Sequence, residues 1–380
     1  MADIAGILTQ IREEVDPTLA PLFFTFEDFY QRKLWHYLTL CLDTFYQSKL
    51  SIGFRMKLYT QFVSEFKWKL NQMKNVEFLS QSLVEVEFPE EKLEYLKTCH
   101  TELEAQDKLD NEQALLFLEV EIARCKLHLK QENDARDELD KIDTKISALD
   151  DVELKLNQSY YSTNSEYYKV KSDYNNFYYQ SLLYLSTVTL DDLSVVDQQR
   201  LAYELSISAL LADKIYNFGE LLIHPILSTL KGSDYNWLVD LLYSLNSGNI
   251  EQFSANLGHL EKNPLLKNSE SFLKQKICLM TLVELVFSKS IRIISFKDVS
   301  KATKLSLDEV EHLVMRALSL GLLKGSIDQI SQTISISWVQ PRIISQEQIA
   351  NMKQKLVEWD ANVSKLGHFM EQNGKEVWIQ

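Results

Sequence analysis

The stretch that decides the fold class is residues 293–339, IISFKDVSKATKLSLDEVEHLVMRALSLGLLKGSIDQISQTISISWV. It opens with a short β run and continues into a short helix at 298–303. A second helix begins after Ser306, where Glu309 completes a capping box. Apolar and polar residues then alternate over 326–339, as they do in a β hairpin with one buried face. This order predicts a winged helix, a helix-turn-helix with a β wing.

Downstream of the hairpin, from Ser345, the sequence predicts one long final helix. Its large apolar residues are separated alternately by three and four positions over about three heptads, which is the a/d pattern of helices that pack together. We call these residues the seam: Ile349, Met352, Leu356, Trp359, Val363, Leu366 and Met370. No second helix follows to cover the seam, so it packs on its own domain or on another chain. Because burial of each large side chain contributes roughly 1.5–3 kcal/mol, we expect a partner chain.

Residues 1–170 show repeated helical periodicity, which predicts a solenoid of helix pairs. The clearest pair consists of helices expected at 111–129 and 135–146, separated by a short polar break. No fixed repeat signature is present, so the repeats are degenerate and only similar to tetratricopeptide repeats. A single pair cannot bury its apolar face alone, and stacked neighbours must cover it.

These patterns predict a mainly α fold with four parts. They are an N-terminal helical-repeat arm at 1–170, a further helical part at 171–270, the winged helix at 271–342 and a C-terminal bundle helix at 343–380. Only 10 glycines and 6 prolines occur in 380 residues, which is typical of a mostly helical chain.

The composition argues against several classes of function. The net charge of -14 and a pI near 5.1 disfavour general binding to nucleic acid or anionic membranes, because both need a basic face. The four cysteines lie far apart in helical patterns, so we expect reduced, buried thiols and a cytosolic or nuclear protein. Residues 1–14 lack the features of a signal peptide, and the longest uncharged stretch, 174–190, is too polar for a membrane span.

No motif for catalysis or cofactor binding is found. The seven histidines are scattered without metal-ligand spacing, and no phosphate-binding loop, dinucleotide fingerprint or nucleophile elbow occurs. Acidic pairs such as Glu90 and Glu91 are interpreted as solvated helix starts, since acids are favoured near helix N-termini. We therefore expect no enzyme activity, no catalytic or metal-binding residues and no cofactor.

A winged helix commonly binds DNA, and the charges of its second helix test that use. The half that would enter the major groove carries Asp308, Glu309 and Glu311, whereas Arg316 stands near the other end. DNA phosphates would repel these carboxylates. Pairing between proteins is the alternative use, because a wing leaves a sheet edge with free backbone groups.

The order of elements also resembles a known family. The residues that carry the resemblance are AYELSISALL at 202–211, IYNFGELL at 215–222, WLVDLL at 237–242 and NSGN at 246–249, followed by the winged helix. Together they are similar to the PCI family, the scaffold subunits of the proteasome lid, the signalosome and a translation initiation factor. Within that family, the IYNFGELL run and the ending WVQPR at 338–342 are most similar to a subunit of the 26S proteasome lid.

The resemblance implies a non-catalytic scaffold subunit of the 26S proteasome regulatory particle lid, which supports assembly and ubiquitin-dependent protein degradation in the cytoplasm and nucleus. The implied partners are other PCI-type and MPN-type lid subunits and neighbouring proteasome subunits, with no nucleic acid and no membrane. The seam would enter a bundle of C-terminal helices. The wing around 327–336, with Ile334 and Ile336 as contact residues, would pair with a neighbouring PCI subunit by edge-strand addition.

Two alternatives stay open at this point. The first is the equivalent PCI subunit of the COP9 signalosome or of the initiation factor complex, which co-purifying chains would identify. The second belongs to a different class, a winged-helix DNA-binding regulator, which salt-sensitive binding to random DNA would favour.

Overall fold

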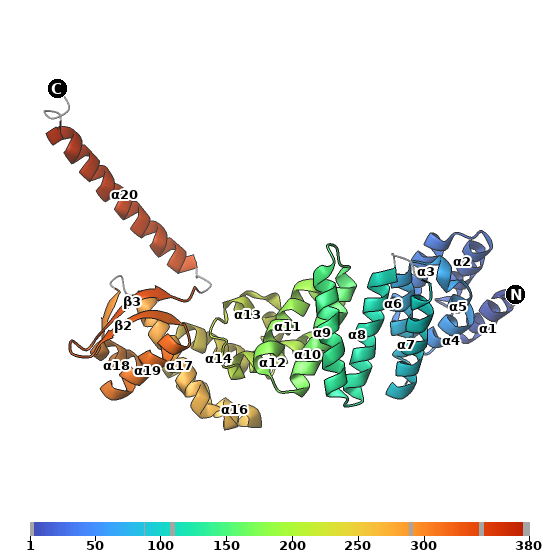
Figure 1. The fold of residues 1–380 in the computed structure, drawn as a ribbon, viewed down its shortest axis with the longest axis horizontal. Helices are drawn as coiled ribbons and strands as arrows, with labels where there is room; N and C mark the ends of the chain where they lie inside the picture. Colours follow the sequence, from blue (N-terminus) through green and yellow to red (C-terminus); the bar gives the residue numbers. More distant parts are fainter. Residues whose placement is uncertain (1–3, 87, 107–110, 289–291, 342–345, 375–380) are drawn as a thin grey trace. The chain divides into compact units, whose positions relative to one another are not determined.

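The computed structural model describes residues 4–86, 88–106, 111–288, 292–341 and 346–374. This part of the chain is helical apart from one small sheet, which confirms the predicted mainly α class (Figure 1). The chain divides into two compact units, Met1–Leu193 and Ser194–Gln380. The division falls at 193/194 rather than at the expected 170/171. The reason is that helices α10 (Leu154–Val170) and α11 (Tyr174–Thr187) pack as one hairpin within the first unit.

The first unit consists of helices that follow one another along the chain and pack on their neighbours (Figure 1). Before the α10–α11 hairpin come α1 (Ile4–Glu14), α2 (Ala20–Gln31), α3 (Trp35–Gln47), α4 (Arg55–Leu58), α5 (Ser64–Phe66), α6 (Gln72–Leu83), α7 (Pro89–Glu104), α8 (Glu112–His128) and α9 (Glu132–Ala148). Short segments of other helix types are η1 (Lys49–Ser51), η2 (Tyr59–Val63), η3 (Lys67–Lys69) and η5 (Leu190–Asp192). The helix pair expected from the polar break is α8 and α9.

One continuous apolar core runs through the first unit, from Leu8 in α1 to Tyr160 in α10. Its N-terminal part is aromatic. Phe26 of α2 contacts Phe45 of α3 and Phe62 of η2, with ring centroids 6.2 Å apart in both cases. Because each helix is covered by its neighbours, the core is built by stacking, as the periodicity predicts.

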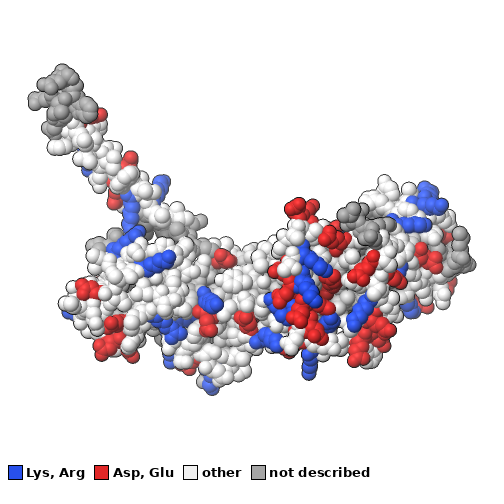
Figure 2. Space-filling model, viewed as in Figure 1, with Lys and Arg blue, Asp and Glu red and all other residues white. Residues whose placement is uncertain are grey.

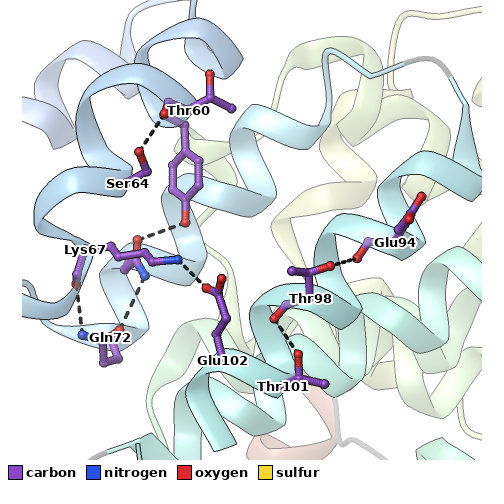
Figure 3. Close-up of polar contacts among 10 residues, drawn as sticks. Thr60, Ser64, Lys67, Gln72, Glu94, Thr98, Thr101 and Glu102 are labelled. Carbon is purple, nitrogen blue, oxygen red and sulfur yellow. Dashed lines mark hydrogen bonds and ion pairs between the residues drawn. The ribbon is translucent and has the colours of Figure 1, made fainter. Parts of the chain in front are cut away.

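Ion pairs fix helices of the first unit against one another. Lys67 of η3 bonds Glu102 of α7, and Figure 3 shows the two side chains pointing toward each other. Farther along the chain, Glu77 of α6 is 8% exposed and bonds Lys155 of α10. A carboxylate this deeply buried needs such a partner, because an unpaired charge in the interior is strongly unfavourable.

The second unit begins with helices and ends in the small sheet and the final helix. Its helices are α12 (Val195–Leu211), α13 (Gly219–Ile223), η6 (Pro225–Leu230), α14 (Asn236–Ser247), α15 (Ile250–Asn256), η7 (Leu257–Lys262), α16 (Pro264–Asn268), α17 (Glu270–Ser288), α18 (Phe296–Thr303), α19 (Leu307–Ser319) and α20 (Gln346–Gly374). Strands β1 (Ile293–Ser295), β2 (Leu323–Asp328) and β3 (Thr333–Val339) form an antiparallel sheet in the order β1-β3-β2. Helices, strands and hairpin thus follow in the predicted winged-helix order, and the capping box of Ser306 and Glu309 is present.

A buried lysine ties α12 to α17. Lys276 is 1% exposed, and its ammonium donates hydrogen bonds to the carbonyls of Ala209 (2.8 Å), Leu210 (3.2 Å) and Ala212 (2.7 Å). These carbonyls lie at the C-terminal end of α12, where the helix dipole favours a cation. Burial works in the other direction and lowers the pKa of Lys276 to about 7.

Replacing Lys276 by methionine should change how stability depends on pH. An unfolded lysine keeps its proton up to about pH 10.5, whereas the folded one releases it near pH 7, so the unfolded state binds more protons between these values. The unfolding free energy of the parent chain should therefore rise from about pH 7 to about pH 9 relative to that of Lys276→Met. Urea unfolding at both pH values measures the two free energies. The same change in unfolding free energy between pH 7 and pH 9 in the parent chain and in Lys276→Met would contradict the prediction.

Gly248→Ala should destabilise the second unit. Gly248 ends α14 with a φ of +66°, and a Cβ added there would lie 2.8 Å from the Cα of Thr281 in α17. Left-handed strain and the backbone clash both oppose alanine, so we expect a loss of about 1–3 kcal/mol in thermal unfolding. Gly258→Ala is the control, because nothing lies within 4 Å of its added Cβ. A loss of the same size in both variants would refute the steric explanation.

Candidate protein interaction site

The predicted seam lies on α20, and all seven of its side chains are exposed. Their exposed fractions run from 47% at Val363 to 66% at Trp359. Spacings of three and four positions keep these side chains on one side of a helix. The described residues of the chain leave that side uncovered.

Two further exposed apolar residues on α20 were not predicted as contact residues. Val357 is 59% exposed and Phe369 is 63% exposed. Phe369 adjoins Met370 and widens the apolar surface beside the seam, whereas Val357 lies nearer the opposite side of the helix. Both fall outside the three-four spacing. A count of every large apolar residue on this helix, rather than of one periodic pattern, would have found them.

Two residues of the wing that were predicted to contact a partner are buried in the structure. Ile334 and Ile336 of β3 are only 1% and 3% exposed, because their face of the sheet packs on the core of their own unit. β3 is also the central strand, since Ser335 pairs with Ile293 of β1 and with Ser326 of β2. The prediction that the side chains of Ile334 and Ile336 contact a partner is therefore wrong.

The free edges of the sheet are β1 and β2. On β2 the residues Lys324, Ser326 and Asp328 are exposed, and the register shifts between Lys324 and Gly325. A Cβ on Gly325 would lie 2.2 Å from the carbonyl oxygen of Ser335, so the close approach of the two strands requires glycine there. An edge of this kind presents free N–H and C=O groups to which another strand can pair.

The helix that would enter a DNA groove, α19, begins with an acidic and exposed turn. Asp308 and Glu309 are both exposed. Hydrogen bonds from the backbone and the hydroxyl of Ser306 hold the pKa of Glu309 below its usual range, so this carboxylate stays charged. Phosphate binding at this end of α19 is unfavourable.

The described part of the chain contains no group of three or more His, Cys, Asp or Glu residues that could hold a metal ion. None of its helices combines the length and the apolar character needed to cross a bilayer. A cavity in the second unit offers about 10 Å³, which is room for one water molecule. It is lined by Tyr216, Asn217, Met280, Val283, Leu322 and Gln340.

Comparison with known families accounts for the main parts of the chain. The family models described as PSD13 N-terminal repeats, PCI domain and Rpn9 C-terminal helix match residues 22–242, 254–338 and 342–374. The first match covers most of the first unit and continues to α14. The second includes the winged helix, and the third includes all of α20.

Individual relatives match along nearly their whole length. The chain is 48% identical to the 26S proteasome regulatory subunit RPN9 of Saccharomyces cerevisiae, over 99% of both chains. It is 40% identical to the probable 26S proteasome regulatory subunit rpn9 of Schizosaccharomyces pombe, over 95% of this chain and 94% of that protein. Identity to the 26S proteasome non-ATPase regulatory subunit 13 homolog B of Arabidopsis thaliana is 33%, over 92% of both chains. The chain therefore belongs to the Rpn9/PSD13 family of 26S proteasome regulatory subunits.

Proposed function

We propose that this chain acts as a scaffold that holds neighbouring lid subunits together through α20 and the wing. As a member of the Rpn9/PSD13 family it is a non-catalytic subunit of the proteasome regulatory lid. The observation that carries the scaffold role is the exposed seam of α20. The proposed partners are other PCI-type and MPN-type lid subunits and neighbouring proteasome subunits. The complex would support ubiquitin-dependent protein degradation in the cytoplasm and nucleus.

The seam is a large apolar surface for a helix in water. Its seven side chains are each about half to two-thirds exposed. Full burial of a large apolar side chain contributes roughly 1.5–3 kcal/mol, so covering the exposed part of the seam would contribute on the order of 10 kcal/mol. That free energy is comparable to the net stability of a folded domain, and it supports a partner that covers α20 in the working state.

A bundle of helices is the partner architecture that fits the seam. α20 spans 29 residues, which corresponds to about 44 Å at the rise of an α-helix. Side chains at three-four spacing insert between those of facing helices that run along the same axis. Trp359 lies near the middle of the helix, and large aromatic residues near the centre of an interface contribute most to binding. We therefore assign Trp359 as the anchor of the bundle contact.

Leu356→Asp and Trp359→Ala should each reduce incorporation of the chain into the lid. Aspartate at position 356 would bury an unpaired charge among apolar helices, and alanine at position 359 would remove the largest side chain of the seam. We expect several-fold less variant in affinity-purified lid. The melting temperature of the isolated chain should not change, because Leu356 and Trp359 are 63% and 66% exposed. Lys355→Ala is the control, and a loss equal to that of Leu356→Asp would contradict the seam assignment.

The second proposed contact is addition of a strand from a neighbouring PCI subunit to the free edge of β2. Backbone N–H and C=O groups point alternately toward β3 and away from it along this strand, so half of them are free to pair. Ile334 and Ile336 support the edge from the core beneath it. A proline at Ser335 would not test the contact, because β3 is paired on both sides and the substitution would break the sheet itself.

Amide hydrogen exchange should detect strand addition at β2. A backbone amide that gains a partner strand exchanges more slowly because its hydrogen bond must open first. We expect residues 323–328 to be protected in the assembled lid relative to the isolated chain. Residues 293–295 of β1, the other edge, serve as the internal reference and should change little. Unchanged exchange at 323–328 on assembly would rule out pairing at this edge.

A further inference from the structure

The first unit carries an exposed apolar surface that neither α20 nor the wing uses. Four large apolar side chains are each more than half exposed: Leu50 (52%), Ile52 (63%), Val84 (73%) and Phe88 (62%). They come from two segments distant in the sequence, the one after α3 and the connection from α6 to α7. We call these four residues the Glu85 patch, after the residue that joins the two segments.

Glu85 holds the two segments together through its carboxylate. One oxygen accepts hydrogen bonds from the backbone amides of Gly53 (2.7 Å) and Arg55 (3.1 Å). The other oxygen accepts a hydrogen bond from the backbone amide of Met56 (3.1 Å). Ile52 precedes Gly53 and Val84 precedes Glu85, so these bonds hold the two segments that carry these apolar residues against each other. The amides lie at the start of α4, where a carboxylate satisfies free N–H groups and the helix dipole.

The support beneath the patch is itself fixed by hydrogen bonds. The guanidinium of Arg55 donates to the carbonyls of Tyr46 (2.6 Å) and Ser48 (3.1 Å). The hydroxyls of Tyr46 and Ser82 lie 3.0 Å apart and form a buried hydrogen bond. The patch is therefore already formed in the free chain, and little ordering free energy would be lost when a partner binds.

The border of the patch on α7 is acidic. Glu90, Glu91 and Glu94 are exposed on the first turns of α7, directly after Phe88. Figure 2 shows acidic side chains gathered over one end of this helix. Tyr95, which is 48% exposed, extends the apolar surface beside them. At this border the exposed carboxylates favour positive charge on a partner, whereas on the other side of the patch the exposed Lys49 lies beside Leu50.

We propose that the Glu85 patch docks a basic, apolar segment of a neighbouring proteasome subunit. Apolar side chains of that segment would cover Ile52, Val84 and Phe88, and its lysines or arginines would face the carboxylates of α7. Apolar burial supplies most of the affinity, and the opposite charges fix the orientation. The inference rests on the proposed scaffold function only in taking the partner to be a proteasome subunit.

A photo-crosslinking amino acid at position 84 in the assembled 26S proteasome tests the proposal. We expect one dominant adduct, with a subunit other than this chain, at a peptide that contains large apolar residues and lysine or arginine. An adduct between two copies of this chain, an adduct with an acidic peptide, or no adduct above the level of the same residue at position 170 would each overturn it. Position 170 is a matched control because Val170 is also an exposed valine of the first unit (55%).

Substitutions then separate the apolar and the charged contributions. Each substitution is made in the chain that carries the photo-crosslinking residue at 84. Phe88→Ser should lower the adduct yield several-fold, and so should the double substitution Glu91→Lys with Glu94→Lys. Glu13→Lys, a charge reversal at an exposed glutamate elsewhere in the unit, should leave the yield unchanged. Melting temperatures of the isolated variants should match that of the parent chain. An unchanged yield in the Phe88 and Glu91/Glu94 variants would refute the assigned patch.

The outcome is distinguishable from a failure of the scaffold proposal. If seam variants of α20 lose incorporation while position 84 gives no adduct, the Glu85 patch is not an interface and the scaffold function stands. If seam variants incorporate normally while position 84 gives the expected adduct, the patch is an interface and the bundle contact through α20 is wrong.

Discussion

The arm depends on one constraint, which is that no helix pair in it can bury its own apolar face. Phe26 of α2 is completely buried only because α3 and η2 supply the facing rings. Longer-range contacts such as that of Glu77 with Lys155 connect helices separated by several others in the sequence. Stacking satisfies the constraint along the arm, but a helix without a neighbour leaves it unsatisfied. In the described part of the chain, α20 is a helix without such a neighbour. The seam residues have the three-four spacing of a helix that packs on others, yet their side chains are exposed.

Much of the fold could be predicted from the sequence because it follows from local chemistry. The capping box at Ser306 and Glu309 depends on residues three positions apart, and the three-four spacing of the seam is a property of one helix. Local patterns of this kind do not depend on what the rest of the chain does. For the same reason they specified the order of the winged-helix elements and the beginning of α20 to within a few residues.

The features that could not be predicted are those set by contacts between distant residues. Alternation in 326–339 indicates that one face is buried, but it does not say that β3 takes the central position, which depends on β1. The buried position of Ile334 and Ile336 follows from the packing of their face of the sheet on the core of the second unit. The Glu85 patch depends on a carboxylate reaching amides about thirty positions away, and no periodicity contains that information. Lys276 is similar, since the sequence shows a lysine in an apolar helix but not the carbonyls that receive it.

The uncovered side of α20 also bears on what happens to copies of this chain made in excess of their partners. A free copy displays nearly a full helix side of apolar residues, which is the kind of surface that drives self-association and that chaperones and degradation factors bind. A surplus is therefore selectively exposed to clearance, whereas an incorporated copy hides the same residues. The level of this subunit would follow the supply of its partners without any dedicated regulator, because the residues that secure it in the complex also mark it when it is alone.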